Sequence, residues 1–515
     1  MGDVRATEEM VRLTARAVAQ PDDLVSDLDA LFAFLIESED DTLALIAYLR
    51  DPCKPPPAPA GGDIEFGFVL YWIHHLPWEI RIYLDLHPLL LVAYELLLSR
   101  APPTKLTAKD YEQLEADFSG YGEPGPDGTL YGRKKYQQLD KDWMLAALNY
   151  ALNLIDPDAI EPLPNKALPP IPLSRKDGNT AKDPVLGIVG DWGTGYYRDE
   201  GGAACPAQRV IGQIVDPAAS PPIDYLIHLG DVYYAGTDWR PLPAEEEDNF
   251  YKHWPDQGPG RNFTLNSNHE MYGAASGYFD VALRPGGPFA AQNGMSYFAL
   301  TYGPWLVLCL DSAYYSDAYN GRKFYMEGAI GTAELDGQIR WLEQFRSHDG
   351  PIMVMTHHNG CDLRGSNVTS LFNQVRAALQ RPPTVWYWGH VHNAIVYDHM
   401  FDSATRRRFV TKGRCCGHGA IPFGNAWGLQ DANGKTISNV LYYAHTPDPD
   451  LPDTGGPNPA NPRVRNGYAL VTLHIDGGFT ESFYETGAVQ PVFQRRWSAG
   501  ELDEPTIIAE PILLA

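Results

Sequence analysis

The sequence predicts a layered α/β fold preceded by a mainly α-helical region, and three observations support this prediction. Five short apolar runs of strand length follow residue 184, at 185–189, 225–229, 305–310, 352–355 and 385–388. Helix-like stretches separate some of these runs, at 333–347 and 369–379. Before residue 156, by contrast, apolar residues recur at helical spacing, as in Leu24, Leu28, Leu31 and Leu35. Strands that alternate with helices are typical of a layered α/β architecture.

The chain is divided by a proline-rich stretch. Pro162, Pro164, Pro169 and Pro170 lie within residues 157–183, and such a composition resists both helix and sheet. We therefore expect residues 1–156 to form an α-helical domain of unknown role, with residues 157–183 as a linker. Residues 184–490 then form the α/β domain, and residues 491–515 form a C-terminal tail.

The expected strands are apolar along their whole length, which predicts strands that are covered on both faces. Residues 236–262 and 425–465 are rich in proline, glycine and acidic residues, and we expect them to be long insertions over the core. The last strand signals, at 468–475 and 479–484, predict a hairpin at the edge of a sheet.

Composition limits the classes of partner. The 515-residue chain has a formal net charge of −25 and a pI of about 4.9, which argues against nucleic acid and anionic membranes as partners. A phosphate substrate is still compatible, because bound cations can reverse the local charge of a site. We expect no secretory signal in residues 1–20 and no membrane span, because the most apolar stretch, 86–98, is interrupted by polar residues. A cytoplasmic location with reduced thiols is therefore expected, and the oligomeric state stays open.

Polar residues of two kinds follow the expected strands closely. Asp191 and Asp231 each come after a glycine, His357 and His358 follow the fourth run, and His390 and His392 follow the fifth. The loops beyond strand ends meet at one rim of a layered α/β fold, where ligands bind. Asp, Asn and His together suit cations such as iron, zinc and manganese, whereas a structural zinc site would need clustered cysteines.

With Ser267-Asn268-His269-Glu270 included, these blocks resemble the five-block signature of the calcineurin-like metallophosphoesterase superfamily over roughly residues 184–490. The nearest pattern is that of purple acid phosphatases. Gly193 stands where many relatives carry a histidine, and Tyr234 stands three residues after the aspartate of the second block. The resemblance implies a layered αββα sandwich and makes residues 184–490 the catalytic domain.

The resemblance also implies two metal ions, Fe paired with Fe, Zn or Mn, with Asp231 bridging them. The first ion would be held by Asp191, Asp231, Tyr234 and His392, and the second by Asp231, Asn268, His357 and His390. His269 would face the phosphate and act as acid or stabiliser, whereas His358 either contacts the substrate or only packs. Ser267 departs from the pattern, which usually has glycine there, and the loop after His358 lacks the histidine that plant enzymes carry.

The hypothesis is that a metal-held hydroxide attacks phosphorus in line, while His269 protonates the departing oxygen. The substrate would be a small phosphate ester, with phosphomonoesters preferred. The first alternative is a phosphodiesterase that uses the same site. The second is a non-catalytic scaffold that retains the fold. It predicts gaps among the ligand residues, and no such gap is visible in the motifs.

Overall fold

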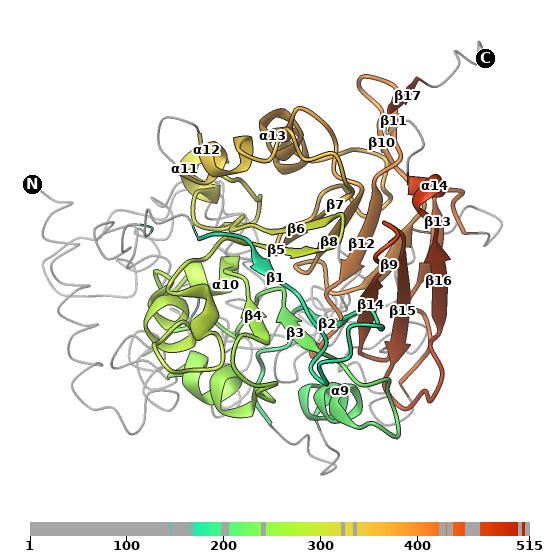
Figure 1. The fold of residues 1–515 in the computed structure, drawn as a ribbon. Coiled ribbons are helices and arrows are strands. Elements are labelled where there is room, and N and C mark those ends of the chain that lie inside the picture. Colours follow the sequence, from blue (N-terminus) through green and yellow to red (C-terminus); the bar gives the residue numbers. More distant parts are fainter. Residues whose placement is uncertain are drawn as a thin grey trace, which may run out of the picture.

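The computed structural model describes Ala146, Leu163 and residues 168–196, 205–237, 244–320, 325–332, 337–421, 429, 436–448, 464–502 and 507–509. Apart from Ala146, the expected N-terminal helical domain lies outside the described residues, as does much of the 425–465 insertion. The described residues form two large sheets with helices on their outer faces (Figure 1).

The first sheet has six strands in the order β16-β15-β14-β2-β3-β4. Strands β2, β3 and β4 are parallel, whereas β14, β15 and β16 are antiparallel to their neighbours. The bounds are β2 Val185–Val189, β3 Tyr225–His228, β4 Asn262–Thr264, β14 Gly467–Leu473, β15 Phe479–Glu485 and β16 Phe493–Trp497.

The second sheet has eight strands in the order β1-β5-β6-β7-β8-β12-β9-β13. Its centre, β6-β7-β8-β12, is parallel. The bounds are β1 Ile171–Pro172, β5 Phe298–Tyr302, β6 Trp305–Cys309, β7 Ile352–Thr356, β8 Val385–Trp388, β9 Ala394–Tyr397, β12 Lys412–Cys416 and β13 Val440–Tyr443. A three-stranded sheet is formed by β10 Met400–Asp402, β11 Arg407–Phe409 and β17 Ile507–Ala509.

Six α-helices lie in the described residues. They are α9 Pro206–Val215, α10 Asn268–Met271, α11 Ser316–Asn320, α12 Gly337–Glu343, α13 Ser370–Leu379 and α14 Ala499–Leu502. Local chemistry sets the limits of the longer ones. Cys205 caps α9 by accepting the N–H of Gln208, and Pro206 follows at the first helical position, where a missing N–H costs nothing. Thr369 caps α13 by accepting the N–H of Phe372. Four short helical turns, η3 Glu246–Phe250, η4 Tyr251–His253, η5 Gly277–Ala282 and η6 Ala290–Gln292, complete the set.

Three hydrophobic clusters hold the layers together. The middle cluster lies between the sheets and joins residues such as Ile188 and Ile227 of one sheet to Val307 and Met355 of the other. The two outer clusters pack α9 against the six-stranded sheet, and α12 and α13 against the eight-stranded sheet. Both faces of the parallel strands are therefore buried. This arrangement confirms the predicted layered α/β sandwich.

The five predicted strands are confirmed within one residue at each end. The predicted hairpin is confirmed as the antiparallel pair β14 and β15, but its predicted place at the edge is wrong, because β14 pairs with β2 and β16 pairs outside β15, so that β16 is the edge. Strand β16 also lies beyond residue 490, where we expected the α/β domain to end. In the described part of the chain, no helix is long and apolar enough to cross a membrane. Five cysteines of the same part are buried and free.

Candidate metal centre

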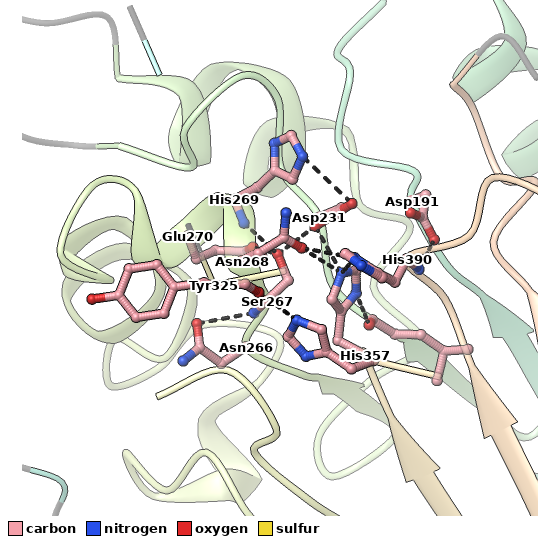
Figure 2. A network of polar contacts seen from close by, with 12 residues as sticks. Asp191, Asp231, Asn266, Ser267, Asn268, His269, Glu270, Tyr325, His357 and His390 are labelled. Atoms are coloured by element: carbon pink, nitrogen blue, oxygen red, sulfur yellow. Dashed lines mark hydrogen bonds and ion pairs between the residues drawn. The ribbon is translucent and has the colours of Figure 1, made fainter. Parts of the chain in front are cut away.

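The candidate residues reach one rim from both sheets. Asp191 follows β2 and Asp231 follows β3 in the six-stranded sheet, while His357 follows β7 and His390 follows β8 in the other. Backbone hydrogen bonds fix the strand ends together: Asp191 N donates to Gly230 O at 3.0 Å, and Gly389 N donates to His357 O at 3.0 Å. Carboxylates and imidazoles from distant segments therefore converge, as Figure 2 shows.

Asp191, Asp231 and His392 form the first group of ligand-type atoms. One such atom from each residue lies within 4.8 Å of the others. The His392 Nε2 atom is 3.4 Å from Asp191 Oδ1 and 4.0 Å from Asp231 Oδ2. A tyrosine hydroxyl completes this group, because Tyr233 donates to Asp231 Oδ2 at 2.8 Å and lies 2.9 Å from His392 Nε2.

The second group surrounds Asn268 Oδ1. This oxygen is 2.8 Å from His357 Nε2 and 3.1 Å from His390 Nδ1, and the two nitrogens are 3.3 Å apart. Asp231 joins this group as well, since its Oδ1 atom is 3.1 Å from His357 Nε2. Asp231 thus turns one oxygen to each group, and the two groups share its carboxylate.

The protonation pattern of the second group fits a cation. His357 Nδ1 lies 2.9 Å from the carbonyl oxygen of Leu229, which can only accept, so Nδ1–H donates; in the neutral ring Nε2 then carries a lone pair. Asn268 Nδ2 donates to the Tyr272 hydroxyl at 2.7 Å, which turns Oδ1 toward that lone pair. In the neutral ring, two lone pairs at 2.8 Å would repel each other, so this contact needs either a metal cation between the two atoms or a proton on Nε2.

The first group fits a cation for a related reason. Asp191 is completely buried, and its Oδ1 atom has no hydrogen-bond partner among the described residues. Burial, and next the negative charge of Asp231, raise the pKa of Asp191. Burial alone would also raise the pKa of Asp231, yet the imidazoles of His269 and His357 hold it well below its usual value. Two adjacent buried carboxylates of this kind are stabilised when positive charge lies between them.

The backbone at the rim adopts an uncommon conformation. Asp191, Asp231 and His390 have φ angles of 56°, 78° and 62°, in the left-handed region that side chains other than glycine rarely occupy. Each such residue costs about 1–3 kcal/mol, a cost that recurs at functional sites. The surrounding packing therefore holds these three residues in the left-handed conformation. Formation of the hydrophobic core alone does not explain why the chain accepts this cost in stability.

His269 lies beside the two groups. It is 5% exposed, and its Nδ1–H donates to the Tyr234 carbonyl at 2.5 Å. The Nε2 atom consequently faces the centre, 3.8 Å from Asp231 Oδ2 (Figure 2). Burial lowers the pKa of His269 to about 4, although Asp231 acts in the opposite direction. The ring also packs against that of Tyr233, with 4.2 Å between centroids.

The two neighbouring tyrosines have different surroundings. The sequence pattern selects Tyr234, but the hydroxyl that lies between Asp231 and His392 belongs to Tyr233. Both tyrosines belong to the same outer hydrophobic cluster, and Tyr234 offers its carbonyl oxygen to His269. Tyr233 was not selected from the sequence. The signal available there was that tyrosine occupies both positions after Val232.

His358 was considered as a substrate contact. It is completely buried, with Nδ1 2.9 Å from the Ser312 hydroxyl and Nε2 2.7 Å from the Tyr325 carbonyl. Because both ring nitrogens contact protein groups, this geometry favours the packing alternative. The ring of His358 packs against the ring of His390, with 4.7 Å between their centroids.

The class of protein follows from a sequence comparison, because a match to a phosphoesterase family model supports a metal-dependent phosphoric ester hydrolase. Residues 185–394 match the family model of the calcineurin-like phosphoesterases, and this matched segment contains all the residues of both groups. The family recognised in the sequence motifs is thereby confirmed for this segment.

Two solved structures illustrate how distant the structural relatives are. One is described as "GAP50 the anchor in the inner membrane complex of Plasmodium", with 11% identity, a TM-score of 0.39 and coverage of 62% of this chain and 89% of that chain. The other is purple acid phosphatase PPD1 from yellow lupin (Lupinus luteus) seeds, with 14% identity, a TM-score of 0.38 and coverage of 65% and 55%. Neither likeness determines the activity or substrate of this chain. No curated protein matches the sequence.

Proposed function

We propose that this chain hydrolyses small phosphate esters, phosphomonoesters in preference to diesters, at a centre of two metal ions. The observation that carries the proposal is the pair of ligand-type groups that share the Asp231 carboxylate. One ion would be held by Asp191, Asp231, His392 and a tyrosine. The other would be held by Asp231, Asn268, His357 and His390. Two ions in such a site would polarise the phosphoryl group and activate water at neutral pH.

The ligand types narrow the choice of metals. Imidazole and carboxylate together suit iron, zinc and manganese, and a phenolate oxygen adds a hard anionic ligand that suits ferric iron. We therefore propose iron paired with iron, zinc or manganese. For the tyrosine ligand we propose Tyr233, because its hydroxyl is 2.8 Å from Asp231 Oδ2 and 2.9 Å from His392 Nε2. The motif resemblance instead favours Tyr234, and exchange of each tyrosine for phenylalanine separates the two assignments.

His269 is the proposed proton donor to the leaving oxygen. Its Nδ1–H is held by the Tyr234 carbonyl, so only Nε2 is available to exchange a proton with a substrate. The low pKa that burial gives this ring keeps it neutral before substrate binds. The negative charge of a phosphate beside Nε2 raises that pKa and favours the protonated ring. His269→Gln is expected to lower kcat by about 10²–10⁴-fold on an ester with a poor leaving group.

The phosphodiesterase alternative uses the same rim. The monoester preference depends on the motif resemblance to purple acid phosphatases, since the metal ligands themselves serve both reactions. Hydrolysis of p-nitrophenyl phosphate and bis(p-nitrophenyl) phosphate by the metal-loaded chain compares the two activities directly. A higher kcat/KM for the monoester supports the proposal, and a higher value for the diester assigns the chain to the alternative.

The scaffold alternative predicts no turnover of either ester by the metal-loaded chain. Treatment with a chelator provides the control, because loss and restoration of activity with the ions distinguishes this chain from a contaminating hydrolase. Loss of activity in Asp231→Ala, purified in the same way, provides a second control. Activity that survives both treatments contradicts the proposed centre.

The relation of residues 1–156 to the catalytic domain is a separate proposal. We propose that they form a unit separate from the catalytic domain, as the proline-rich stretch before residue 172 indicates. Limited proteolysis is expected to cut between residues 157 and 170 and to leave a fragment that still hydrolyses the ester. A fragment without activity would make the N-terminal region part of the catalytic unit.

A further inference from the structure

Ser267 lies directly behind the shared carboxylate. It precedes α10 and is completely buried. Its hydroxyl oxygen lies 2.5 Å from Asp231 Oδ1 and accepts the backbone N–H of His269 at 3.0 Å. The same oxygen contacts the carboxyl group of Glu270, which is also completely buried. Three polar groups therefore meet at one serine oxygen, and one of them is the carboxylate common to both ligand groups (Figure 2).

The oxygen of Asp231 that Ser267 contacts is the one turned toward the second group. Asp231 Oδ1 is 3.1 Å from His357 Nε2, whereas Oδ2 faces Tyr233 and His392. The serine hydroxyl has a single hydrogen and two carboxyl neighbours, Asp231 and Glu270; when that hydrogen points to Asp231 Oδ1, the bond restricts the rotation of the Asp231 carboxylate. That rotation decides how Asp231 divides its two oxygens between the groups.

A buried chain of hydrogen bonds fixes Ser267 in turn. Ser267 N donates to Asn266 Oδ1 at 3.0 Å, and Asn266 Nδ2 donates to Asp311 Oδ2 at 3.2 Å. Asp311 follows β6 of the opposite sheet, where it accepts the N–H groups of Ala313 and Tyr314 at 3.0 and 2.9 Å. The backbone of Ser267 is thus linked to the end of β6 in the eight-stranded sheet, while its hydroxyl contacts a carboxylate carried by the six-stranded sheet.

We propose that Ser267 is a positioning residue, whose hydroxyl orients the Asp231 carboxylate so that its Oδ1 atom serves the ion held by Asn268, His357 and His390. This inference rests on the proposed two-ion centre and adds a residue to it. The resembling motif has glycine at this position, and glycine cannot supply the contact. The centre of this chain is therefore supported by a hydrogen bond that the motif alone does not imply.

The test uses the full chain in four forms: wild type, S267A, S267T and S482A. Ser482 is a matched control, because it is a nearly buried serine of β15 whose hydroxyl accepts from Gln494 and not from the rim. Zn²⁺ and Mn²⁺ binding to each metal-free protein is measured by calorimetry, together with its thermal unfolding midpoint. kcat and KM for p-nitrophenyl phosphate are then measured at saturating metal.

S267A is expected to weaken binding of the ion held by Asn268, His357 and His390 about 10–100-fold. This is the usual effect of losing a group that orients a metal ligand. Its kcat is expected to fall while KM stays near that of the wild type. S267T keeps the hydroxyl and is expected to restore the metal affinity, and S482A is expected to match the wild type. A change in packing alone would lower the unfolding midpoint of the metal-free S267A protein without selective loss of one ion.

Two results overturn the inference alone. The first is that S267A binds both ions as tightly as the wild type. The second is that S267T binds ions as weakly as S267A does, although the unfolding midpoint of S267T is unchanged. A wild-type chain that binds fewer than two ions contradicts the proposed function instead, and the inference fails with it. The two failures are thus distinguished by the wild-type titration.

Discussion

Replacement of Gly389 with alanine changes the rim without removing any ligand. A Cβ atom built at Gly389 would lie 2.5 Å from Asp191 Oδ2, and one built at Gly417 would lie 2.8 Å from the same oxygen. The Asp191 carboxylate is therefore enclosed by two glycines. Ordinary contact begins at 3.4 Å, so G389A requires a displacement of about 0.9 Å. The displaced oxygen also accepts the N–H of His390 at 3.0 Å, so that residue is disturbed as well.

A misplacement of about 1 Å at a reacting centre costs on the order of 10²-fold in rate. We therefore expect G389A to lower kcat/KM for p-nitrophenyl phosphate about 100-fold and to reduce the content of the first ion. The free energy of unfolding should also fall, by roughly 1–3 kcal/mol, as for other overpacked sites. Steady-state hydrolysis, elemental analysis and urea unfolding measure the three quantities.

Gly212 supplies the matched glycine-to-alanine control. It lies in α9, and a Cβ atom built there meets no heavy atom within 4 Å. G212A should leave turnover unchanged and stabilise the chain by about 0.5–1 kcal/mol, because alanine is favoured over glycine inside a helix. If G389A instead retains wild-type turnover with a full complement of metal, the close approach of Gly389 to Asp191 has no functional meaning and the reasoning is refuted.

Four further predictions follow from named contacts. Asn268→Ala and His357→Ala should each abolish turnover and lower metal content, measured by ester hydrolysis and elemental analysis; full activity in either variant removes that residue from the ligand set. In the iron-loaded protein, a visible absorption band from tyrosine-to-iron charge transfer should be lost in Tyr233→Phe and kept in Tyr234→Phe, whereas the opposite result restores the assignment from the motif. Arg414→Ala leaves Glu481 buried without its ion pair and should cost about 3–5 kcal/mol in urea unfolding; a loss below about 1 kcal/mol contradicts a structural role for the pair. The hydrogen bond from His399, followed by the charges of Lys412, His399 and Arg408, holds the pKa of Asp398 well below its usual value, so its stabilisation is present above about pH 4 and is lost as acid protonates the folded state. Asp398→Asn should therefore be less stable than the wild type at pH 7, by less than about 1 kcal/mol because the group is partly exposed, and the difference should shrink progressively as the pH falls below about 4; a difference that does not shrink contradicts the account.

Much of the fold could be predicted because the parallel strands are buried on both faces. Continuous apolar runs such as Val185–Val189 and Ile352–Thr356 are unambiguous for that reason. Strand β16, with the sequence FQRRW, carries three consecutive polar side chains between two aromatic residues, so it resembled a tail. Its pairing with β15 depends on the neighbouring strand, which a local pattern does not reveal.

The convergence of the candidate site could be predicted for a similar reason. Asp191, Asp231, His357 and His390 directly follow buried parallel strands, and the carboxyl ends of such strands meet at one rim. The orientation of side chains within the following turns could not be predicted. Tyr233 and Tyr234 are identical and adjacent, and only the path of the loop decides which hydroxyl reaches the rim.

The burial of individual side chains, and the contacts they make behind the candidate ligands, also could not be predicted from the sequence. His358 and His357 are adjacent histidines, yet the ring nitrogens of His358 are engaged by Ser312 and Tyr325 from other segments. Ser267 appeared only as a departure from glycine, because its contact with Asp231 depends on a fold that brings residues 36 positions apart together. Such contacts depend on tertiary packing, and a short sequence motif does not predict them.

The most direct test of the account is the number of metal ions that one chain holds. Elemental analysis of the full chain, reconstituted with excess ions and then freed of unbound metal, should give two ions per wild-type chain. Asp231→Ala should lose both ions, because its carboxylate is common to the two groups, whereas His357→Ala should lose one. A wild-type chain with a single ion, or an Asp231→Ala chain that keeps two, would contradict a centre built on a shared carboxylate.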